Sequence, residues 1–249
     1  MSLEGKVALV TGGGRGIGRG LAIELAREGS DIVITSRTAS ELHETAETIR
    51  SLGHRCLDRA IDATDENQVS ELFDTVDAEF GRLDILVNNA GGIVVAPLTE
   101  TTMEQWNQVH AANIGAAFLC SRAAIPMMRS VGGGSIINIS SMGGVAGFPM
   151  LAAYCSAKAA IIGFTRALAA ELAADAIRVN ALCPDIVATP TTLSVFGEAD
   201  QSDWADPEDM GSIVVFLAGR GSKFVNGAVI EATGRWPHDP LQRQYLAAH

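Results

Sequence analysis

Short runs rich in β-branched and other apolar residues alternate along this chain with longer segments of helical periodicity. The runs lack a clean apolar–polar alternation, which is typical of strands buried on both faces of a parallel sheet. The helical segments are long enough to serve as the crossovers that parallel strands need. The expected strands are 6–11, 31–36, 55–61, 83–89, 134–140, 177–183 and 225–230, and the expected helices are 17–28, 39–52, 66–80, 102–129, 153–174 and 207–218.

No linker, repeat or low-complexity run divides the 249 residues. The pattern therefore predicts one α/β domain over residues 1–249. We expect a doubly wound parallel sheet of about seven strands with helices on both faces.

A glycine-rich loop, VTGGGRGIGRG at 10–20, follows the first predicted strand and leads into the first helix. Gly12, Gly16 and Gly18 are spaced GxxxGxG. Glycine is needed where the backbone takes a positive φ or where a pyrophosphate must approach without meeting a Cβ. The following helix presents free N–H groups to the phosphates. The loop therefore predicts a dinucleotide site in a Rossmann fold.

The end of the second predicted strand indicates which dinucleotide binds. An acidic residue there would hold the adenosine ribose and repel a 2′-phosphate. The chain instead has Ser36 and Arg37, and Arg15 lies in the glycine loop. Guanidinium groups bind phosphate well, although Arg37 could also be an ordinary solvated cation. We expect NADP(H), with NAD(H) as the second choice.

Only two tyrosines occur in the chain, and one of them, Tyr154, lies in the stretch AAYCSAK at 152–158. On a helix, Tyr154 and Lys158 project from the same face. A nearby ammonium would lower the pKa of the phenol from its usual value of about 10. Ser141 follows a predicted strand at the edge of the sheet where ligands bind. Its hydroxyl could bond a substrate carbonyl or alcohol oxygen.

Together these segments resemble the short-chain dehydrogenase/reductase family over about residues 5–233. The segments that match, in the family's order and spacing, are TGGGRGIG (11–18), NNAG (88–91), the NIG that contains Asn113, INISS (137–141), YCSAK (154–158), VNALCP (179–184) and PED (207–209). The resemblance implies hydride transfer between NADP(H) and a carbonyl/secondary-alcohol pair. Ketone reduction, as in the family's bacterial ketoreductases, is the first expectation. A non-catalytic dinucleotide sensor or scaffold, or an epimerase or dehydratase using transient oxidation, are the alternatives.

The resemblance also implies roles for individual residues. Tyr154 is expected to be the general acid/base, and Lys158 to lower its pKa and bind the nicotinamide ribose. Ser141, rather than Ser140, is expected to orient the substrate oxygen, and Asn113 to hold a water that relays protons. The expected cofactor contacts are Gly12, Arg15, Gly16, Ile17, Gly18, Ser36, Arg37, Asp62 (adenine), Ala63, Asn89, Ala90, Gly91, Tyr154, Lys158, Pro184, Val187 and Thr189 (carboxamide).

The chain departs from the family pattern after the sixth predicted strand. Asp185 follows Pro184 where the family usually has glycine. Aspartate tolerates a positive φ better than most residues, so the turn could survive. Its carboxylate either faces the nicotinamide, where it would stabilise the oxidised ring, or is solvated. Residues 188–206 form a short expected lid, in which Phe196 and Trp204 are either pocket walls or core.

The carboxyl end also departs from the pattern. EATGRW (231–236) replaces the family's Asp-Gly-Gly, and a tail follows from about residue 235. The tail either packs across a neighbouring subunit's site or is disordered, and Trp236, Leu241, Tyr245 and Leu246 favour packing.

Composition narrows the functional classes. A formal net charge of −11 argues against a nucleic-acid partner. The four cysteines and five histidines form no ligand pattern, so no metal site is expected. No secretory signal or membrane span is predicted. We expect a cytoplasmic protein with a small-molecule substrate. The small-residue helix at 153–174 fits intrachain packing or a subunit interface, and the family resemblance implies a tetramer or dimer.

Overall fold

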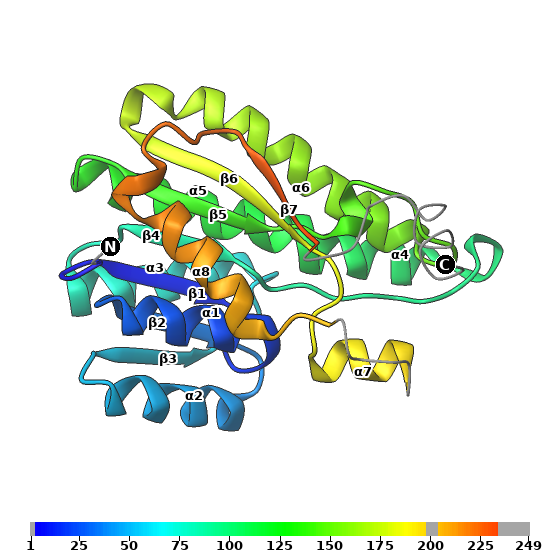
Figure 1. Cartoon of the computed structure of the whole chain (residues 1–249), viewed down its shortest axis with the longest axis horizontal. Helices are drawn as coiled ribbons and strands as arrows, with labels where there is room; N and C mark the ends of the chain where they lie inside the picture. Colours follow the sequence, from blue (N-terminus) through cyan, green and yellow to red (C-terminus); the bar gives the residue numbers. More distant parts are fainter. Residues whose placement is uncertain (1–2, 198–203, 234–249) are drawn as a thin grey trace, which may run out of the picture.

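The computed structural model describes residues 3–197 and 204–233, which contain a seven-stranded sheet. All strand pairs are parallel, in the order β3-β2-β1-β4-β5-β6-β7 (Figure 1). The strands are Val7–Thr11 (β1), Asp31–Ser36 (β2), Cys56–Ala60 (β3), Ile85–Asn88 (β4), Gly134–Ile139 (β5), Ile177–Pro184 (β6) and Val229–Ala232 (β7). The strand order reverses between β1 and β4. The predicted doubly wound sheet is therefore confirmed.

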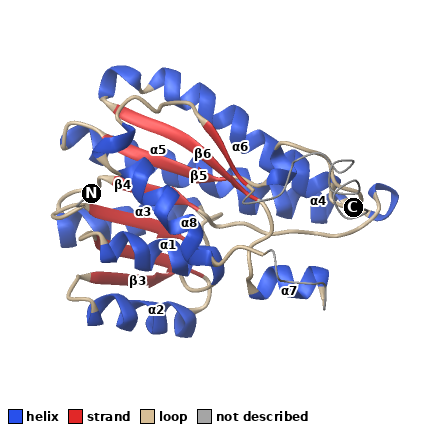
Figure 2. Ribbon diagram, viewed as in Figure 1, coloured by secondary structure: helices blue, strands red, loops and turns tan. Residues whose placement is uncertain are grey.

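Helices cover both faces of the sheet (Figure 2). One face carries α1, α2 and α8, and the other carries α3, α5 and α6. The helices are Gly16–Arg27 (α1), Ala39–Ser51 (α2), Glu66–Phe80 (α3), Met103–His110 (α4), Ala116–Ser130 (α5), Ala152–Glu171 (α6), Pro190–Phe196 (α7) and Pro207–Ala218 (α8), with short turns at Leu98–Glu100 (η1), Ala111–Gly115 (η2), Met142–Gly144 (η3), Ala173–Asp175 (η4) and Arg220–Ser222 (η5).

Strand β1 shows how the sequence pattern forms the core. All five of its residues are buried. Ala8 and Val10 join the cluster under α1 and α8, whereas Val7 and Leu9 join the cluster under α3 and α5. Side chains on a strand alternate between faces, so a strand between two helical layers needs apolar residues on both of its faces. Each fully buried aliphatic side chain contributes about 1.5–3 kcal/mol.

The structure differs from the expected elements in three places. The predicted helix at 102–129 is α4 and α5 joined by a π-helical turn, η2. The last strand begins four residues later than predicted, at Val229 rather than 225. The lid contains a helix, α7, which was not predicted. Thr189 accepts a hydrogen bond from the backbone N–H of Thr192 and Pro190 follows at the first turn, so α7 has an ordinary N-terminus.

The helical run from Met103 to Ser130 is long and apolar enough to cross a membrane by length and composition. In the fold its second half, α5, packs against α3 and β4. Its apolar residues therefore pack against one face of the sheet. Length and composition alone are weak support for a membrane span.

Asp84 lies at the amino end of β4 and is almost fully buried. Its carboxylate accepts hydrogen bonds from Lys6 Nζ at 2.9 Å, from Arg82 Nε and Nη2 at 2.8 Å each, and from the Val7 backbone N–H at 3.0 Å. Burial opposes ionisation, yet these hydrogen bonds outweigh it and hold the pKa of Asp84 below its usual value. The cluster fastens β1 to β4 at the edge of the sheet opposite the glycine loop.

Candidate active site

A cleft of about 950 Å³ opens at the carboxyl edge of the sheet. Loops after each of the strands β1 to β6 line it, together with α4, η2, α6 and α7. It spans the point where the strand order reverses, the usual ligand site of such sheets. The sequence-predicted residues that line it are Gly12, Arg15, Gly16, Ile17, Gly18, Ser36, Arg37, Asp62, Ala63, Asn89, Ala90, Gly91, Asn113, Ser141, Tyr154, Lys158, Pro184, Val187 and Thr189.

The glycine loop forms the floor of one end of the cleft. Gly12 and Gly16 take positive φ angles of 68° and 54°. A Cβ at Gly18 would lie 2.1 Å from the Gly12 carbonyl oxygen, so only glycine fits there. Helix α1 has no side-chain cap at its N-terminus, which leaves its first N–H groups available to an anion. The loop therefore fits a pyrophosphate.

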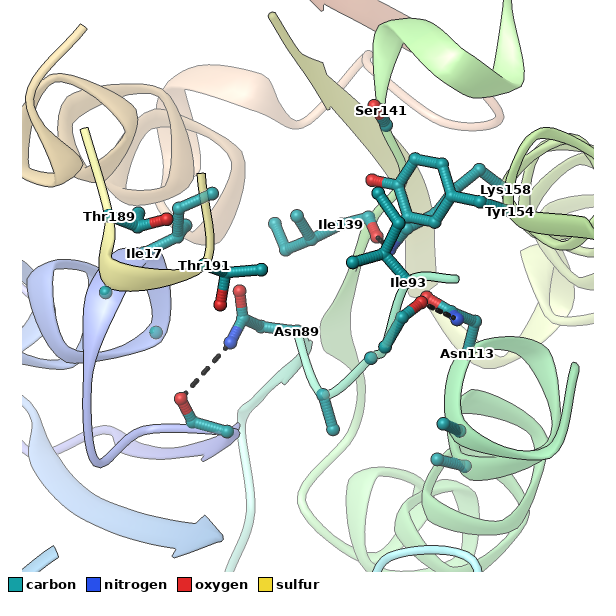
Figure 3. Close-up of a pocket in the computed structure, with 18 of the residues that line it drawn as sticks. Ile17, Asn89, Ile93, Asn113, Ile139, Ser141, Tyr154, Lys158, Thr189 and Thr191 are labelled. Atoms are coloured by element: carbon teal, nitrogen blue, oxygen red, sulfur yellow. Dashed lines mark hydrogen bonds between the residues drawn. The ribbon is translucent and has the colours of Figure 1, made fainter. Parts of the chain in front are cut away.

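Asn89 fastens this loop to the end of β4. Its Nδ2 donates to the Thr11 carbonyl oxygen at 2.9 Å, and Thr11 Oγ1 accepts from the backbone N–H groups of Asn89 and Ala90 at 3.0 and 2.9 Å. Figure 3 shows Asn89 between the two halves of the cleft. Its amide is thus used to position the loop.

The predicted phosphate-binding arginines lie at the same end. Arg37 is exposed and has no partner among the described residues. Arg15 Nη1 lies 3.4 Å from Glu41 Oε1 in an exposed ion pair. Glu41 was not identified from the sequence, because nothing in α2 marks it as a neighbour of the glycine loop. Asp62 is engaged by its own turn, since its Oδ1 accepts from the N–H and hydroxyl of Thr64.

Tyr154 and Lys158 lie on one face of α6, and Ser141 lies just beyond β5 (Figure 3). Lys158 is buried and its Nζ donates to the Ile139 carbonyl oxygen at 3.0 Å. Ser140 Oγ donates to the Lys158 carbonyl oxygen at 2.8 Å, so this hydroxyl is occupied with the helix backbone. Ser141 Oγ accepts from the Gly143 N–H at 3.0 Å, which leaves its proton free to donate to Tyr154. The structure thus favours Ser141 over Ser140 for a substrate contact.

The protonation of these groups differs from the sequence-based expectation. Burial raises the pKa of Tyr154, and the hydrogen bond from Ser141 offsets this only in part. Burial also lowers the pKa of Lys158 to about 8. The lysine Nζ lies 5.7 Å from the centre of the Tyr154 ring and bonds Ile139 instead of the phenol. We expected the Lys158 ammonium to lower the pKa of Tyr154; instead burial raises this pKa, so that expectation is wrong. Tyr154 retains its proton at neutral pH.

Asn113 lies in the π-helical turn η2, a feature often found at functional sites. Its Nδ2 donates to the carbonyl oxygens of Val109 at 2.8 Å and Gly92 at 2.9 Å. Its Oδ1 is buried and has no hydrogen-bond partner among the described residues. A Cβ built on Gly91 would lie 2.5 Å from this oxygen and 3.5 Å from Lys158 Nζ, so both atoms face the same small space. An orphaned acceptor there fits a bound water or ribose hydroxyl.

The segment after β6 forms the roof of the cleft. Asp185 lines the cleft, but its φ is not positive. Its N–H instead donates to the Ala232 carbonyl oxygen at 3.1 Å and extends the β6–β7 pairing. The turn therefore survives without the positive φ that we expected aspartate to tolerate. Val187 pairs with Ala205 in an isolated bridge, which joins the two ends of the lid.

Sequence reasoning missed apolar side chains that line the cleft. They lie in loops, in the short turn η3 or on α7, and belong to no motif, so no signal marked them. They are Ile93, Val94, Met142, Phe148, Leu151, Ile186 and Val195. Trp204, expected as a wall or core residue, is not among the residues that line the cleft. The side chain of Phe196, and the tail residues Trp236, Leu241, Tyr245 and Leu246, lie outside the described residues.

The site fits a nicotinamide dinucleotide. The glycine loop leaves room that a Cβ would fill, α1 offers free N–H groups, two guanidinium groups line the outer end, and an orphaned amide oxygen lies near Lys158. Within residues 3–197 and 204–233, no group of three or more histidine, cysteine or acidic side chains is placed to hold a metal ion.

Comparison with known proteins agrees with this geometry. The family model described as short chain dehydrogenase matches residues 6–199. Cyclopentanol dehydrogenase of Comamonas sp. (strain NCIMB 9872) is 36% identical over 92% of this chain and 96% of its own.

Two solved structures share the fold and differ in their cofactor. One is a protein of Beutenbergia cavernae, provisionally assigned as an NAD(P)-dependent gluconate 5-dehydrogenase, with bound NADP at low occupancy. It is 36% identical, with a TM-score of 0.88, over 94% of this chain and 98% of its own. The other is a short chain dehydrogenase of Mycobacterium paratuberculosis bound to NAD, 31% identical with a TM-score of 0.87 over the same shares. This chain therefore belongs to the short-chain dehydrogenase/reductase family and is an oxidoreductase that binds NAD(P)(H).

Proposed function

We propose that the protein is an NADP(H)-dependent reductase that converts a ketone to a secondary alcohol. The observation that carries this proposal is the placement of Tyr154. Its side chain lines the same cleft as Ser141 and the glycine loop, and a phenol whose pKa burial raises is protonated at neutral pH. A protonated acid beside a dinucleotide cradle is what carbonyl reduction requires.

Each residue near the reacting carbon has a separate task. The substrate carbonyl oxygen would accept hydrogen bonds from Ser141 and Tyr154, which polarises the carbonyl. The glycine loop and Lys158 would hold NADPH, which would supply the hydride that the carbonyl carbon needs. Tyr154 would give its hydroxyl proton to the oxygen, which completes the alcohol. Lys158 would stabilise the phenolate left behind, and a water on Asn113 Oδ1 would relay a proton from solvent back to it.

The preference for NADP(H) rests on Arg15 and Arg37. Both line the outer end of the cleft, where the adenosine ribose would lie, and Arg37 is exposed without a described partner. Guanidinium groups suit a phosphate monoester. NAD(H) remains the second candidate because Glu41 already pairs with Arg15 and would oppose a second negative charge.

We also propose that the enzyme is cytoplasmic and forms a homo-oligomer. Ala159, Ala160 and Gly163 form an exposed small-residue face on α6, which would allow a second copy to approach closely. A tetramer or dimer is the proposed state.

A fluorescence titration with NADPH and NADH tests the cofactor. We expect tighter binding of NADPH, and Arg37→Ala should weaken NADPH by about 10-fold while leaving NADH unchanged, because only the 2′-phosphate contact is lost. Arg220→Ala, at an exposed arginine in η5 that does not line the cleft, is the matched control. Equal affinities would overturn the NADP(H) preference.

Turnover tests the reaction. Tyr154→Phe should bind NADPH normally but lose about 10³-fold in the rate of ketone-dependent NADPH oxidation, since the proton donor is gone. If the wild-type protein binds NADPH but none of the ketones offered leads to its oxidation, the protein would instead be a dinucleotide sensor.

A further inference from the structure

The two ends of the cleft differ in charge. Arg15, Arg37, Glu41 and Asp62 are the ionisable groups at the end beside the glycine loop and β2. At the other end, beside Tyr154, the described lining is mostly apolar. Its apolar members, together called the apolar wall, are Ile93, Val94, Met142, Phe148 and Leu151. A substrate that reaches the phenol therefore meets hydrocarbon on most sides.

No described cation at the reactive end could anchor an anionic substrate. Lys158 is the only lysine or arginine among the described residues that line this end, and it is buried with its Nζ directed at the Ile139 carbonyl oxygen. Asp185 lines the same end and adds a carboxylate. Moving an unpaired anion from water into such a place is costly. A carboxylate or phosphate on the substrate would have no counter-ion there.

The apolar wall is also held in a defined shape. The Ala96 N–H donates to the Met150 carbonyl oxygen at 2.9 Å, which ties the loop after β4 to the loop after β5. Met150 adopts a left-handed φ of 64°, and the Leu151 N–H bonds Phe148 at 3.3 Å. Backbone strain of this kind persists where surrounding structure fixes it, often at ligand sites. Phe148, which lines the cleft, and its neighbours in these two loops, Val95 and Met150, remain 42–50% exposed.

We infer that the substrate is an uncharged ketone with an apolar body, paired with the corresponding secondary alcohol. The described residues of the wall offer no group that would pair with an anionic sugar acid or oxo acid. This inference rests on the proposed reductase function and adds the substrate class.

A matched pair of ketones tests the inference. Methyl 4-oxocyclohexanecarboxylate and 4-oxocyclohexanecarboxylate share the ring and the carbonyl and differ in charge at pH 7. With NADPH in excess, we expect kcat/KM for the ester to exceed that for the carboxylate by about 100-fold or more, because the anion would lose its hydration without gaining a partner. Equal values, or a preference for the carboxylate, would overturn the inference and leave the reductase function standing.

A charge placed in the wall sharpens the test. Phe148→Arg should reduce the ester-to-carboxylate ratio by about 10-fold or more, since a guanidinium at this position would pair with the carboxylate. Phe148→Leu, which keeps the wall apolar, should preserve the ratio. Both variants should bind NADPH as the wild type does. An unchanged ratio in Phe148→Arg would show that the substrate does not pass this wall and would overturn the inference.

Binding without turnover separates the two proposals. Calorimetry of the Tyr154→Phe protein saturated with NADPH reports affinity for each ketone whether or not hydride is transferred. If the ester binds preferentially but the wild type turns over neither compound, the inference stands and the reductase function fails. If the carboxylate binds as well as the ester, or if neither binds, the inference fails.

Discussion

The two edges of the sheet differ in how fully a buried charge is hydrogen-bonded. At the amino edge, the carboxylate of Asp84 accepts four hydrogen bonds, and its pKa lies below the usual value. At the carboxyl edge, the ammonium of Lys158 is buried and donates to the Ile139 carbonyl oxygen, and burial lowers its pKa to about 8. Nearby, Asn113 Oδ1 has no partner among the described residues.

This contrast indicates that the amino edge of the sheet contributes to stability and the carboxyl edge to function. A buried charge that is fully bonded favours the folded chain, whereas one that is poorly bonded is tolerated where a ligand will complete it. The same sheet therefore has one edge that holds the strands together and one edge prepared for chemistry. Changing a charge at each edge should have opposite effects on stability and activity.

The largest effect is expected at Lys158. Lys158→Met should lower kcat for ketone reduction by about 10³-fold, because the phenolate of Tyr154 loses its cation and the proton relay loses a member. The melting temperature should not fall, since a buried ammonium is replaced by an apolar chain of similar length. Stopped-flow kinetics and calorimetry measure the two quantities.

Lys223→Met is the control for this change, because Lys223 is exposed and lies away from the cleft. A kcat within 10-fold of the wild type in Lys158→Met, or a clear loss of stability, would contradict the contrast between the edges.

A smaller effect is expected at Asp84. Asp84→Asn should reduce the free energy of unfolding by about 2–4 kcal/mol, since Lys6 and Arg82 lose a buried partner. The kcat/KM of the folded protein should not change, as Asp84 is at the far edge. Urea denaturation measures the loss, and Asp74→Asn, an exposed aspartate on α3, is the control.

The pH dependence of this stability follows from the sign of the shift. The pKa of Asp84 is lower in the folded protein than in the unfolded chain, where it is about 3.9. Its contribution is therefore complete above about pH 4 and is lost as pH falls through the folded pKa. In Asp84→Asn, the free energy of unfolding should no longer contain this pH-dependent contribution. If stability fell with acid in the variant as it does in the wild type, Asp84 would not be the group responsible.

The sequence predicted the sheet and the residues gathered in the cleft because both depend on local signals. A strand as apolar as Val7–Thr11, with threonine only at its end, is expected between two layers, and the glycine spacing after it provides the positive φ angles of the loop. Even α7 had a local signal, since Thr189 followed by Pro190 is an ordinary helix start.

The remaining features depend on contacts distant in sequence. The π-helical turn around Asn113 is tied by its amide to the Gly92 carbonyl oxygen, 21 residues away. The raised pKa of Tyr154 comes from burial, which a YxxxK spacing does not encode. Phe148 and Ile93 become neighbours of the reacting group only because two loops meet in the fold. Such features could not be predicted from the chain alone.

The smallest expected effect is the pH dependence of reduction. Burial sets the pKa of Lys158 at about 8, so the ammonium is lost progressively above that pH, while the raised pKa of Tyr154 keeps its proton in place. The value of kcat/KM should therefore be flat near neutrality and fall about 10-fold per unit above pH 8. Steady-state rates with a neutral ketone and NADPH between pH 6 and 10.5 measure this, with Arg220→Ala as a variant that should superpose on the wild type. An inflection near 10.4, where an exposed lysine titrates, would mean that Lys158 is as well stabilised as in water. The buried ammonium at the carboxyl edge would then be as well stabilised as the Asp84 carboxylate at the amino edge. The two edges would not differ in the way that we propose.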